Sequence, residues 1–173
     1  NDVVIRCVDS EHFLLPFEEI ETQFPQGKHV MMEHFYRRMR KRFNILMQDG
    51  NPIGGKGNYD ANNRHKLQRK DIEELPAPLM FSSDVNDVVK RLQRHNIQTI
   101  GRMEGELLWP ISRTQSLSLL AHFCQVCLPN FGRFQDAMTA EHGAKWSLYH
   151  SRLSFSLNSK LLHPQEVINA ALS

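Results

Sequence analysis

The clearest periodic pattern of apolar residues lies between His29 and Met47. Apolar side chains recur there every three or four positions, which is the spacing of one face of an α-helix. Basic side chains fall mostly between them, so the pattern predicts a helix with an apolar face and a basic face. The same period predicts helices over Asp84 to Asn96, where Asp84 is placed to cap, and over Thr114 to Leu128.

Local signals predict where the helices begin and end. Pro129 and Gly132 are expected to end the helix over Thr114 to Leu128. Ser10 can cap a helix over Glu11 to Phe24, which Pro16 breaks. Further helices are predicted over Phe134 to Met138, over Trp146 to Leu162 with Ser151 as a cap, and from Pro164 onward.

The segment Asp2 to Val8 differs from these helices because it is short and rich in β-branched residues. This composition predicts one strand, but few later segments can pair with it. We therefore expect the strand to be left over from a preceding α/β domain. The predicted fold class is mainly α, with pieces of a helical bundle and two long loops, Asp49 to Arg64 and Leu75 to Met80.

Size and composition narrow the class of protein. The chain has 173 residues, 40% of them hydrophobic and 23% charged, which is typical of one globular domain or two small ones. No apolar run approaches the length that crosses a bilayer, and no secretory leader is visible. The three cysteines are an odd number, which does not favour a disulfide scaffold, so we expect a cytoplasmic protein.

Charge is unevenly distributed along the chain. Between Lys28 and Lys70 there are eleven Lys or Arg residues and three acids, a net charge of +8, while the remainder carries −6. A local positive field of this kind fits a polyanion such as nucleic acid. It equally fits a solvated helix face followed by a charged loop, and the charge alone does not decide between the two.

Two motifs imitate known sites. Gly50 to Lys56 resembles a phosphate-binding loop, but Gly57 stands where that loop needs a Ser or Thr hydroxyl, and a helix precedes it. Cys124 and Cys127 have the spacing of metal ligands, but no second pair is present. Both lie in the apolar stripe of a predicted helix, so we predict that they pack as small hydrophobic residues and predict no metal site.

A third motif, Tyr149 to Ser154, opens a predicted helix. Unpaired N–H groups and the helix dipole at such an end favour an anion, to which Arg152 could add a charge-assisted hydrogen bond. An ordinary capped helix fits the same local pattern.

Five motifs occur in order along the chain: Phe35 to Arg42, Gly54 to Arg64, Trp109 to Thr114, Leu128 to Met138 and Tyr149 to Ser154. Together they resemble the deoxyribodipyrimidine photolyase-related proteins, the bacterial iron–sulfur cryptochrome and photolyase group. The resemblance implies that residues 1–27 are the tail of an antenna α/β domain. Residues 28–108 would be a basic helical connecting segment with long loops, and residues 109–173 the start of a helical FAD-binding domain.

The resemblance also implies a function and a cofactor. Reduced FAD in such proteins donates an electron to a pyrimidine dimer in DNA, or a related flavoprotein senses blue light. The FAD-binding residues carried over by the motifs are His150, Ser151, Arg152, Leu153 and Ser154 at the phosphates and Phe134 at the flavin. Most of this pocket, the iron–sulfur cluster and the antenna chromophore belong to other parts of the parent. The 173 residues alone are therefore expected to be inactive.

The lesion-binding residues implied by the resemblance are Lys56, Tyr59, Asp60 and Arg64. The expected partners are damaged DNA and the remaining domains of the same chain, with no membrane. Two alternatives stay open, a non-catalytic basic helical module that binds nucleic acid and an interdomain scaffold without a ligand.

Overall fold

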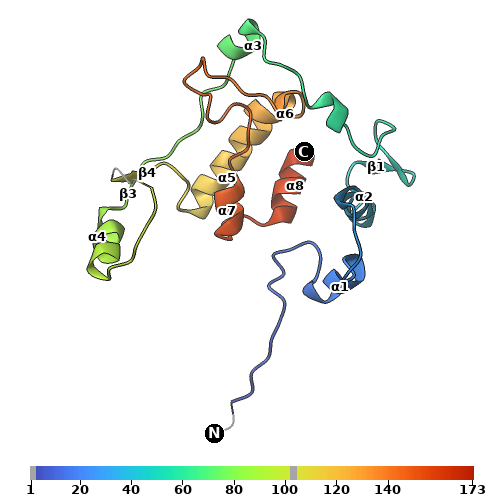
Figure 1. Cartoon of the computed structure of the whole chain (residues 1–173), viewed down its shortest axis with the longest axis horizontal. Helices are drawn as coiled ribbons and strands as arrows, with labels where there is room; N and C mark the ends of the chain where they lie inside the picture. The colour runs from blue at the N-terminus through green and yellow to red at the C-terminus, as the bar shows by residue number, and fades with distance from the viewer. Residues whose placement is uncertain (1–2, 102–104) are drawn as a thin grey trace. The chain divides into compact units, whose positions relative to one another are not determined.

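The computed structural model describes residues 3–101 and 105–173, and helices dominate it (Figure 1). Sheet structure in these residues is limited to two antiparallel pairs of short strands. The predicted mainly α class is confirmed. The chain forms two compact units, Asn1–Ala61 and Asn62–Ser173, and each is described by itself. The three-part division at residues 27 and 108 stays a prediction.

The first unit is built around helix α2 (Met32–Arg42). Before it lie a 3₁₀ turn (Phe17–Glu19) and helix α1 (Ile20–Gln23), and after it come strands β1 (Met47–Gln48) and β2 (Asn51–Pro52). The 3₁₀ turn begins directly after Pro16, so the break predicted at this proline is confirmed. Ser10 is not a helix cap, because the next residue, Glu11, has a φ of 55° and no helix begins there.

Helix α2 is shorter than the predicted span of residues 29–47. It ends at Arg42 because Asn44 and Leu46 take left-handed backbone conformations, with φ values of 52° and 49°. A right-handed helix cannot continue through such residues. The apolar period therefore extends past the helix into the following turn.

The strand predicted over residues 2–8 is wrong for the part that the structure describes. Residues 3–8 form no strand, and the side chains of Val3, Val4, Ile5 and Val8 are more than 80% exposed. Strand residues need a partner strand for their backbone groups, and these residues have none within the described chain. β-branched composition alone does not supply a partner.

The second unit contains most of the helices. Its elements in order are helix α3 (Arg69–Glu73), strand β3 (Ser83–Asp84), helix α4 (Asn86–Arg94), strand β4 (Glu106–Leu107), helices α5 (Arg113–His122) and α6 (Leu128–Phe134), helix α7 (Ser154–Asn158) and helix α8 (Pro164–Leu172). The helix predicted over residues 84–96 is confirmed as α4, but its cap position is Val85 and not Asp84 as predicted. Asp84 ends strand β3 and accepts a hydrogen bond from the Asn86 amide at 2.9 Å. A 3₁₀ turn, Asp60–Asn62, lies where the two units meet in sequence.

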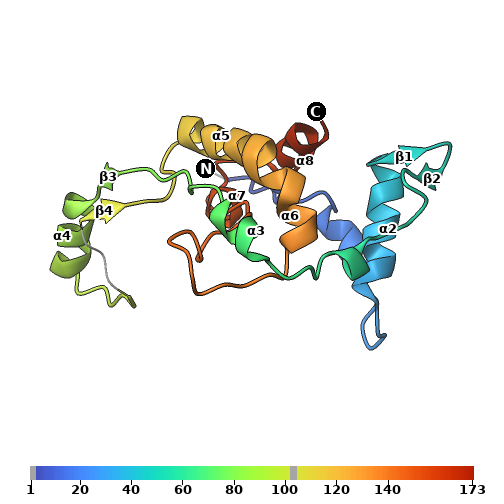
Figure 2. The ribbon, with the colours of Figure 1, turned by 90° about the horizontal axis from the view of Figure 1, so that it is seen from above.

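Pro129 does not end the long helix, contrary to the sequence prediction. Helix α5 passes through a π-helical segment, Phe123–Cys127, into α6, which runs to Phe134 (Figure 2). A proline has no N–H to donate and its ring displaces the carbonyl four residues earlier. The wider π turn just before Pro129 accommodates both effects, so the helical run continues. Gly132 also lies inside α6, and residues 135–138 are not helical.

The helix predicted over residues 146–162 is reduced to the five residues of α7. Leu148 and Arg152 have positive φ values of 45° and 57°, which prevent a helix across residues 148–152. Ser151 is therefore not a helix cap: the cap position is Leu153, and Ser151 Oγ accepts only the Leu153 amide at 3.4 Å. The helix predicted from Pro164 is confirmed as α8.

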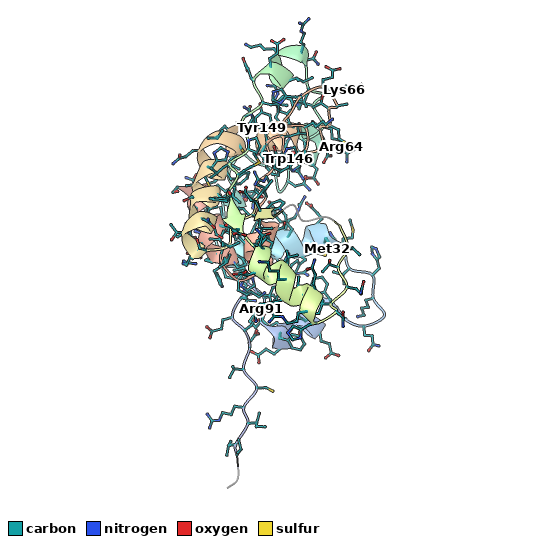
Figure 3. The ribbon with its side chains drawn as sticks, turned by 90° about the vertical axis from the view of Figure 1, so that its left-hand side faces the viewer. Met32, Arg64, Lys66, Arg91, Trp146 and Tyr149 are labelled. Atoms are coloured by element: carbon teal, nitrogen blue, oxygen red, sulfur yellow. The ribbon has the colours of Figure 1, made fainter. Side chains whose placement is uncertain are left out.

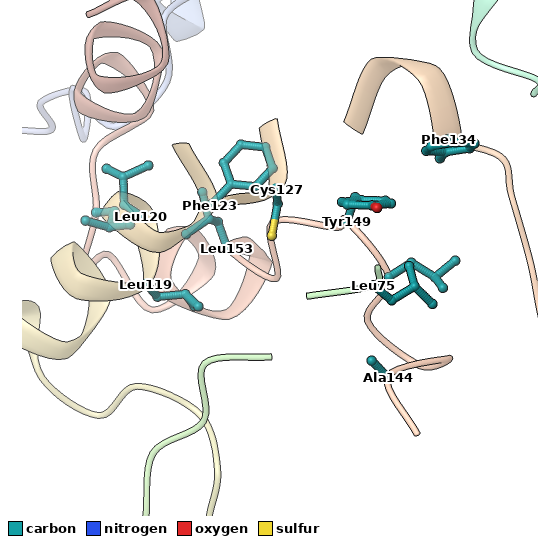
Figure 4. Close-up of a cluster of buried hydrophobic side chains, with 11 residues drawn as sticks. Leu75, Leu119, Leu120, Phe123, Cys127, Phe134, Ala144, Tyr149 and Leu153 are labelled. Carbon is teal, nitrogen blue, oxygen red and sulfur yellow. The ribbon is translucent and has the colours of Figure 1, made fainter. Parts of the chain in front are cut away.

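The core of the second unit gathers apolar side chains from α5, the π-helical segment, α6 and the segment before α7 (Figure 4). Leu119 and Leu162 are almost completely buried, and Cys127 is 4% exposed. Cys124 is partly buried and packs against this core, so both cysteines pack as predicted. Phe134 and Tyr149 stack with ring centroids 5.6 Å apart.

Polar contacts join three helices of the second unit. The hydroxyls of Ser116 on α5 and Ser156 on α7 are fully buried and lie 3.0 Å apart in a hydrogen bond. Arg113 at the start of α5 forms an ion pair with Glu166 on α8 and donates to the Leu161 carbonyl at 3.0 Å. The Arg113 hydrogen bond lowers the pKa of the Glu166 carboxyl. Helices α5, α7 and α8 are thus fixed by specific pairs as well as by apolar packing.

Candidate functional site

Arg152 is the centre of the candidate site in the second unit. Its guanidinium carbon lies 4.8 Å from the ring centroid of Trp146 and 5.1 Å from that of Trp109, within range of cation–π attraction to both. One guanidinium nitrogen, Nη1, donates to the Leu79 carbonyl at 2.8 Å. Three segments that are distant in sequence therefore meet at one side chain.

No carboxylate among the described residues neutralises the positive charge of Arg152. No ion pair to this residue occurs among the described residues, and its Nε is buried without a hydrogen-bond partner. Burial lowers the pKa of the guanidinium from its ordinary value. A desolvated cation with an unused donor attracts an anion more strongly than a hydrated surface arginine does.

The same burial and the charge of Arg152 also shift the pKa values of two neighbouring side chains, His122 and Cys127. Burial lowers the pKa of the His122 imidazole, and the charge of Arg152 lowers it further. Burial raises the pKa of the Cys127 thiol, against a smaller opposing effect of Arg152. Both changes keep these side chains neutral, so they leave the arginine as the charged group of the site.

The predicted FAD-binding residues around Arg152 divide into surface and core positions. Ser154 and His150 are exposed, and Ser151 is half-buried. His150 also contacts the edge of the Phe131 ring, with centroids 5.8 Å apart. Leu153 and Phe134 are 3% and 2% exposed and belong to the hydrophobic core.

The space enclosed beside Arg152 is small. A hollow bounded by His122, His150 and Arg152, among others, measures about 10 Å³, which is enough for roughly one water molecule. A dinucleotide does not fit inside it. A phosphate could reach only the outer faces of Ser151 and Ser154 unless the stack around Arg152 opens.

The predicted lesion-binding residues lie in different units, Lys56, Tyr59 and Asp60 in the first and Arg64 in the second. The Tyr59 hydroxyl donates to the Gly54 carbonyl at 2.8 Å, which closes the glycine-rich loop on itself. The side chain of Arg64 is 76% exposed and lies 3.6 Å from the Asp136 carboxylate (Figure 3). A contact so exposed contributes little, and the guanidinium remains accessible.

A buried arginine holds the loop that carries Lys56 and Tyr59. Arg40 on α2 is 7% exposed and donates to the carbonyls of Ile45 at 3.2 Å, Leu46 at 2.9 Å and Gly57 at 2.7 Å. Sequence analysis gave Arg40 no such role. The only local signal is its position on the helix, four residues after Tyr36, whose ring lies 5.8 Å from the guanidinium carbon.

A second set of contacts joins the same loop to α2. Glu33 accepts from Arg37 Nε at 2.6 Å and from Asn58 Nδ2 at 2.5 Å, and these hydrogen bonds lower the pKa of the Glu33 carboxyl. Gly57 lies against Arg37, because a Cβ at this position would come within 2.7 Å of the guanidinium. A larger residue at position 57 would displace Arg37 from this contact.

Trp109, Trp146 and Leu79 are the residues of the Arg152 site that sequence analysis did not assign. Trp109 belongs to a recognised motif, but no spacing rule brings it to Arg152. The contact depends on the left-handed conformation at Arg152 itself, which directs the side chain toward both indoles. No residue pattern in the sequence signals that conformation.

Comparison with known proteins identifies the family of this chain. Residues 1–108 match the family described as deoxyribodipyrimidine photo-lyase-related protein. This match covers more than half of the chain, so the chain belongs to that family.

A curated relative extends the comparison to most of the chain. The "(6-4) photolyase" of Agrobacterium fabrum (strain C58) is 36% identical over 163 residues, which are 92% of this chain. The chain spans 31% of the length of that relative. Within the described residues, no helix combines the length and the apolar composition that a bilayer span requires.

Proposed function

We propose that this chain is a segment of a light-dependent DNA repair photolyase, or of a related flavoprotein, and that it contributes part of an FAD site. The observation that carries this proposal is the match to a (6-4) photolyase along 92% of the chain. When bound, reduced FAD supplies the electron that splits a dimerised pyrimidine lesion. The proposal places this protein in the cytoplasm, with the iron–sulfur cluster and antenna chromophore bound by other parts of the same polypeptide.

Arg152 is the residue of this chain whose surroundings best support a role at the cofactor phosphates. Its charge has no carboxylate partner in the described chain, and its Nε lacks an acceptor. Ser151 and Ser154 add hydroxyl groups beside it, and His150 adds an imidazole. In this proposal both buried residues act from the core side, Leu153 beneath the cofactor phosphates and Phe134 at the flavin.

The test of the cofactor role compares variants of the full-length protein that carries this segment. The Ser151→Ala, Arg152→Ala double variant is expected to retain less FAD after purification than the parent, measured by absorbance of the released flavin. Arg91→Ala, an exposed residue on α4, is the control and should keep its flavin. Full FAD occupancy in the folded double variant would contradict the phosphate assignment.

The lesion-binding role is proposed for Lys56, Tyr59, Asp60 and Arg64. The exposure of Arg64 and the anchored loop around Lys56 support a contact with the DNA backbone, which is read without sequence preference. Arg64→Ala in the full-length protein should weaken binding of damaged DNA in a gel-shift assay and leave the flavin content unchanged. Unchanged lesion binding would remove Arg64 from the site.

The charge distribution also supports a second candidate, a basic helical module that binds nucleic acid without catalysis. The two candidates differ in an observable way. The photolyase proposal requires a flavin absorption band and light-dependent reversal of a lesion by the full-length protein. Salt-sensitive DNA binding without any flavin would favour the second candidate.

A further inference from the structure

The first unit contains a basic hollow that none of the assignments above uses. It measures about 610 Å³, opens to solvent, and lies between the end of α1 and the first turns of α2. Its lining includes four basic or titratable side chains, Lys28, His29, His34 and Arg38. No acidic residue lines it.

Other arginines on α2 are already committed to partners. Arg42 forms a two-point ion pair with Glu19, at 2.5 and 2.8 Å, and Arg37 pairs with Glu33 at 2.6 Å. Arg40 donates its hydrogen bonds to carbonyls of the following loop. Two of the four arginines of this helix, Arg37 and Arg42, are therefore neutralised by a nearby acid.

The basic residues of the hollow have no such ion pair among the described residues. Arg38 donates to the neutral Gln23 amide oxygen at 2.9 Å, and no ion pair joins Lys28, His29, His34 or Arg38 to a carboxylate in the described chain. Glu33 is the acid next in sequence to His34, and its two carboxylate oxygens accept from Arg37 and Asn58 instead. Glu33 still interacts with His34 through its charge, so Lys28 and Arg38 are the lining charges that no carboxylate of the described chain pairs with.

We propose that this hollow binds a phosphate group. Lys28 and Arg38 supply charge-assisted donors, and Gln23 keeps its amide N–H groups free for a ligand because its oxygen accepts from Arg38. The Thr22 hydroxyl in the same lining adds a further donor. The phosphate belongs to a nucleic-acid backbone or to a small phosphorylated molecule, since both present the same oxygens to these donors.

The experiment uses the 173-residue chain and three probes at low ionic strength. Inorganic phosphate and adenosine monophosphate are titrated by calorimetry, and a labelled undamaged oligonucleotide is titrated by fluorescence anisotropy. The Lys28→Gln, Arg38→Gln double variant should bind phosphate at least about tenfold more weakly, because it loses charge-assisted hydrogen bonds. A parallel loss of oligonucleotide binding identifies nucleic acid as the source, and a loss confined to the small probes identifies a small ligand.

The control is Lys41→Gln, Arg91→Gln, which removes the same net charge from exposed residues outside the hollow. It should change phosphate affinity by less than about twofold. Equal losses in the two double variants, or no saturable phosphate binding by the parent chain, would overturn the proposal. Circular dichroism establishes that each variant is folded.

A single substitution tests the same idea without removing a basic residue. Gln23→Glu places a carboxylate where Arg38 already donates, so it retains that contact and reduces the positive charge of the hollow by one. Phosphate affinity should fall at least about tenfold, while the melting temperature stays the same or rises. Undiminished phosphate binding by this variant would count against the site. The proposal is independent of FAD, so it can fail while the proposed function holds, and the reverse.

Discussion

The guanidinium carbon of Arg152 lies 4.8 Å from the centre of the Trp146 ring, and the Trp109 ring lies 5.1 Å from the same carbon. These are the two tryptophans of the chain. The intrinsic tryptophan fluorescence of these 173 residues therefore comes from one site, the surroundings of Arg152. Because both indoles lie against Arg152, a change in the packing of the candidate site can be followed in solution by tryptophan fluorescence.

Replacing Arg152 by lysine tests how much the stack contributes. Lysine keeps the charge but has no planar group to lie over an indole or to reach the Leu79 carbonyl in the same way. We expect Arg152→Lys to lower the free energy of unfolding of the second unit by about 1–2 kcal/mol. Urea unfolding followed by tryptophan fluorescence measures the change.

The control for this substitution is Arg91→Lys on α4, because Arg91 is exposed and has no ion pair in the described residues. It should leave the urea midpoint unchanged. If both variants unfold at the midpoint of the parent, the stacked geometry does not stabilise the fold.

The buried hydroxyl pair Ser116 and Ser156 is expected to show strong coupling. Ser116→Ala leaves the Ser156 hydroxyl in the core without its partner, at a cost of about 1–3 kcal/mol. The double variant Ser116→Ala, Ser156→Ala removes both polar groups and should be more stable than the sum of the single losses predicts. A double-mutant cycle from urea unfolding gives the coupling energy, and additive losses would rule out the pair as a unit.

Arg40 is expected to control the order of the loop that follows α2. Arg40→Met retains much of the buried aliphatic volume but removes the donors to Ile45, Leu46 and Gly57. We expect a loss of at least about 1.5 kcal/mol in the first unit and faster amide exchange over residues 45–59, measured by hydrogen–deuterium exchange with mass spectrometry.

Lys41→Met provides the matched control, since Lys41 is the next residue on the helix and is exposed. Exchange over the loop should match the parent in this variant. Identical exchange in the Arg40 variant would show that the loop holds its shape without the three hydrogen bonds.

His122 is expected to make the second unit less stable in mild acid. Burial, and then Arg152, lower the pKa of its imidazole, so the unfolded chain binds more protons there than the folded chain. The neutral His122 imidazole contributes its full share of the folding stability above the ordinary histidine pKa of about 6.5. This share is lost as the pH falls toward the lower pKa of the folded state. The melting temperature, followed by tryptophan fluorescence, should drop between about pH 7.5 and 5.5.

The His122→Asn variant should lose part of this pH dependence, whereas His95→Asn, at an exposed residue after α4, should keep it. If the melting temperature of His122→Asn and that of the parent fall in parallel as the pH is lowered, the His122 imidazole does not cause the loss of stability in acid.

Local sequence signals were sufficient where a helix is decided by its own residues. The apolar period over residues 84–96 predicted α4, and Pro164 predicted the start of α8. Both predictions hold because apolar spacing and proline geometry act within one or two helical turns. The apolar stripe also correctly predicted the packing of Cys127 in the core and of Cys124 against it.

Local signals failed where backbone conformation depends on distant contacts. The apolar period continues to residue 47, but α2 stops at Arg42. After it Asn44 and Leu46 take left-handed conformations, and Arg40 donates to the carbonyls of Ile45 and Leu46. The π turn before Pro129 is a similar case, because packing against the core holds the helical run together across the proline.

The amino-acid sequence by itself determined the helical class, the positive segment and, through its ordered motifs, the family. These properties depend on which residues are present and on their spacing along the chain. The tertiary structure alone decided that Arg152 lies against two indoles and that Arg40 is buried beneath a loop. It also left Lys28 and Arg38 without a carboxylate partner among the described residues. Charge compensation and burial are set by three-dimensional neighbours, and a residue's position in sequence does not specify them.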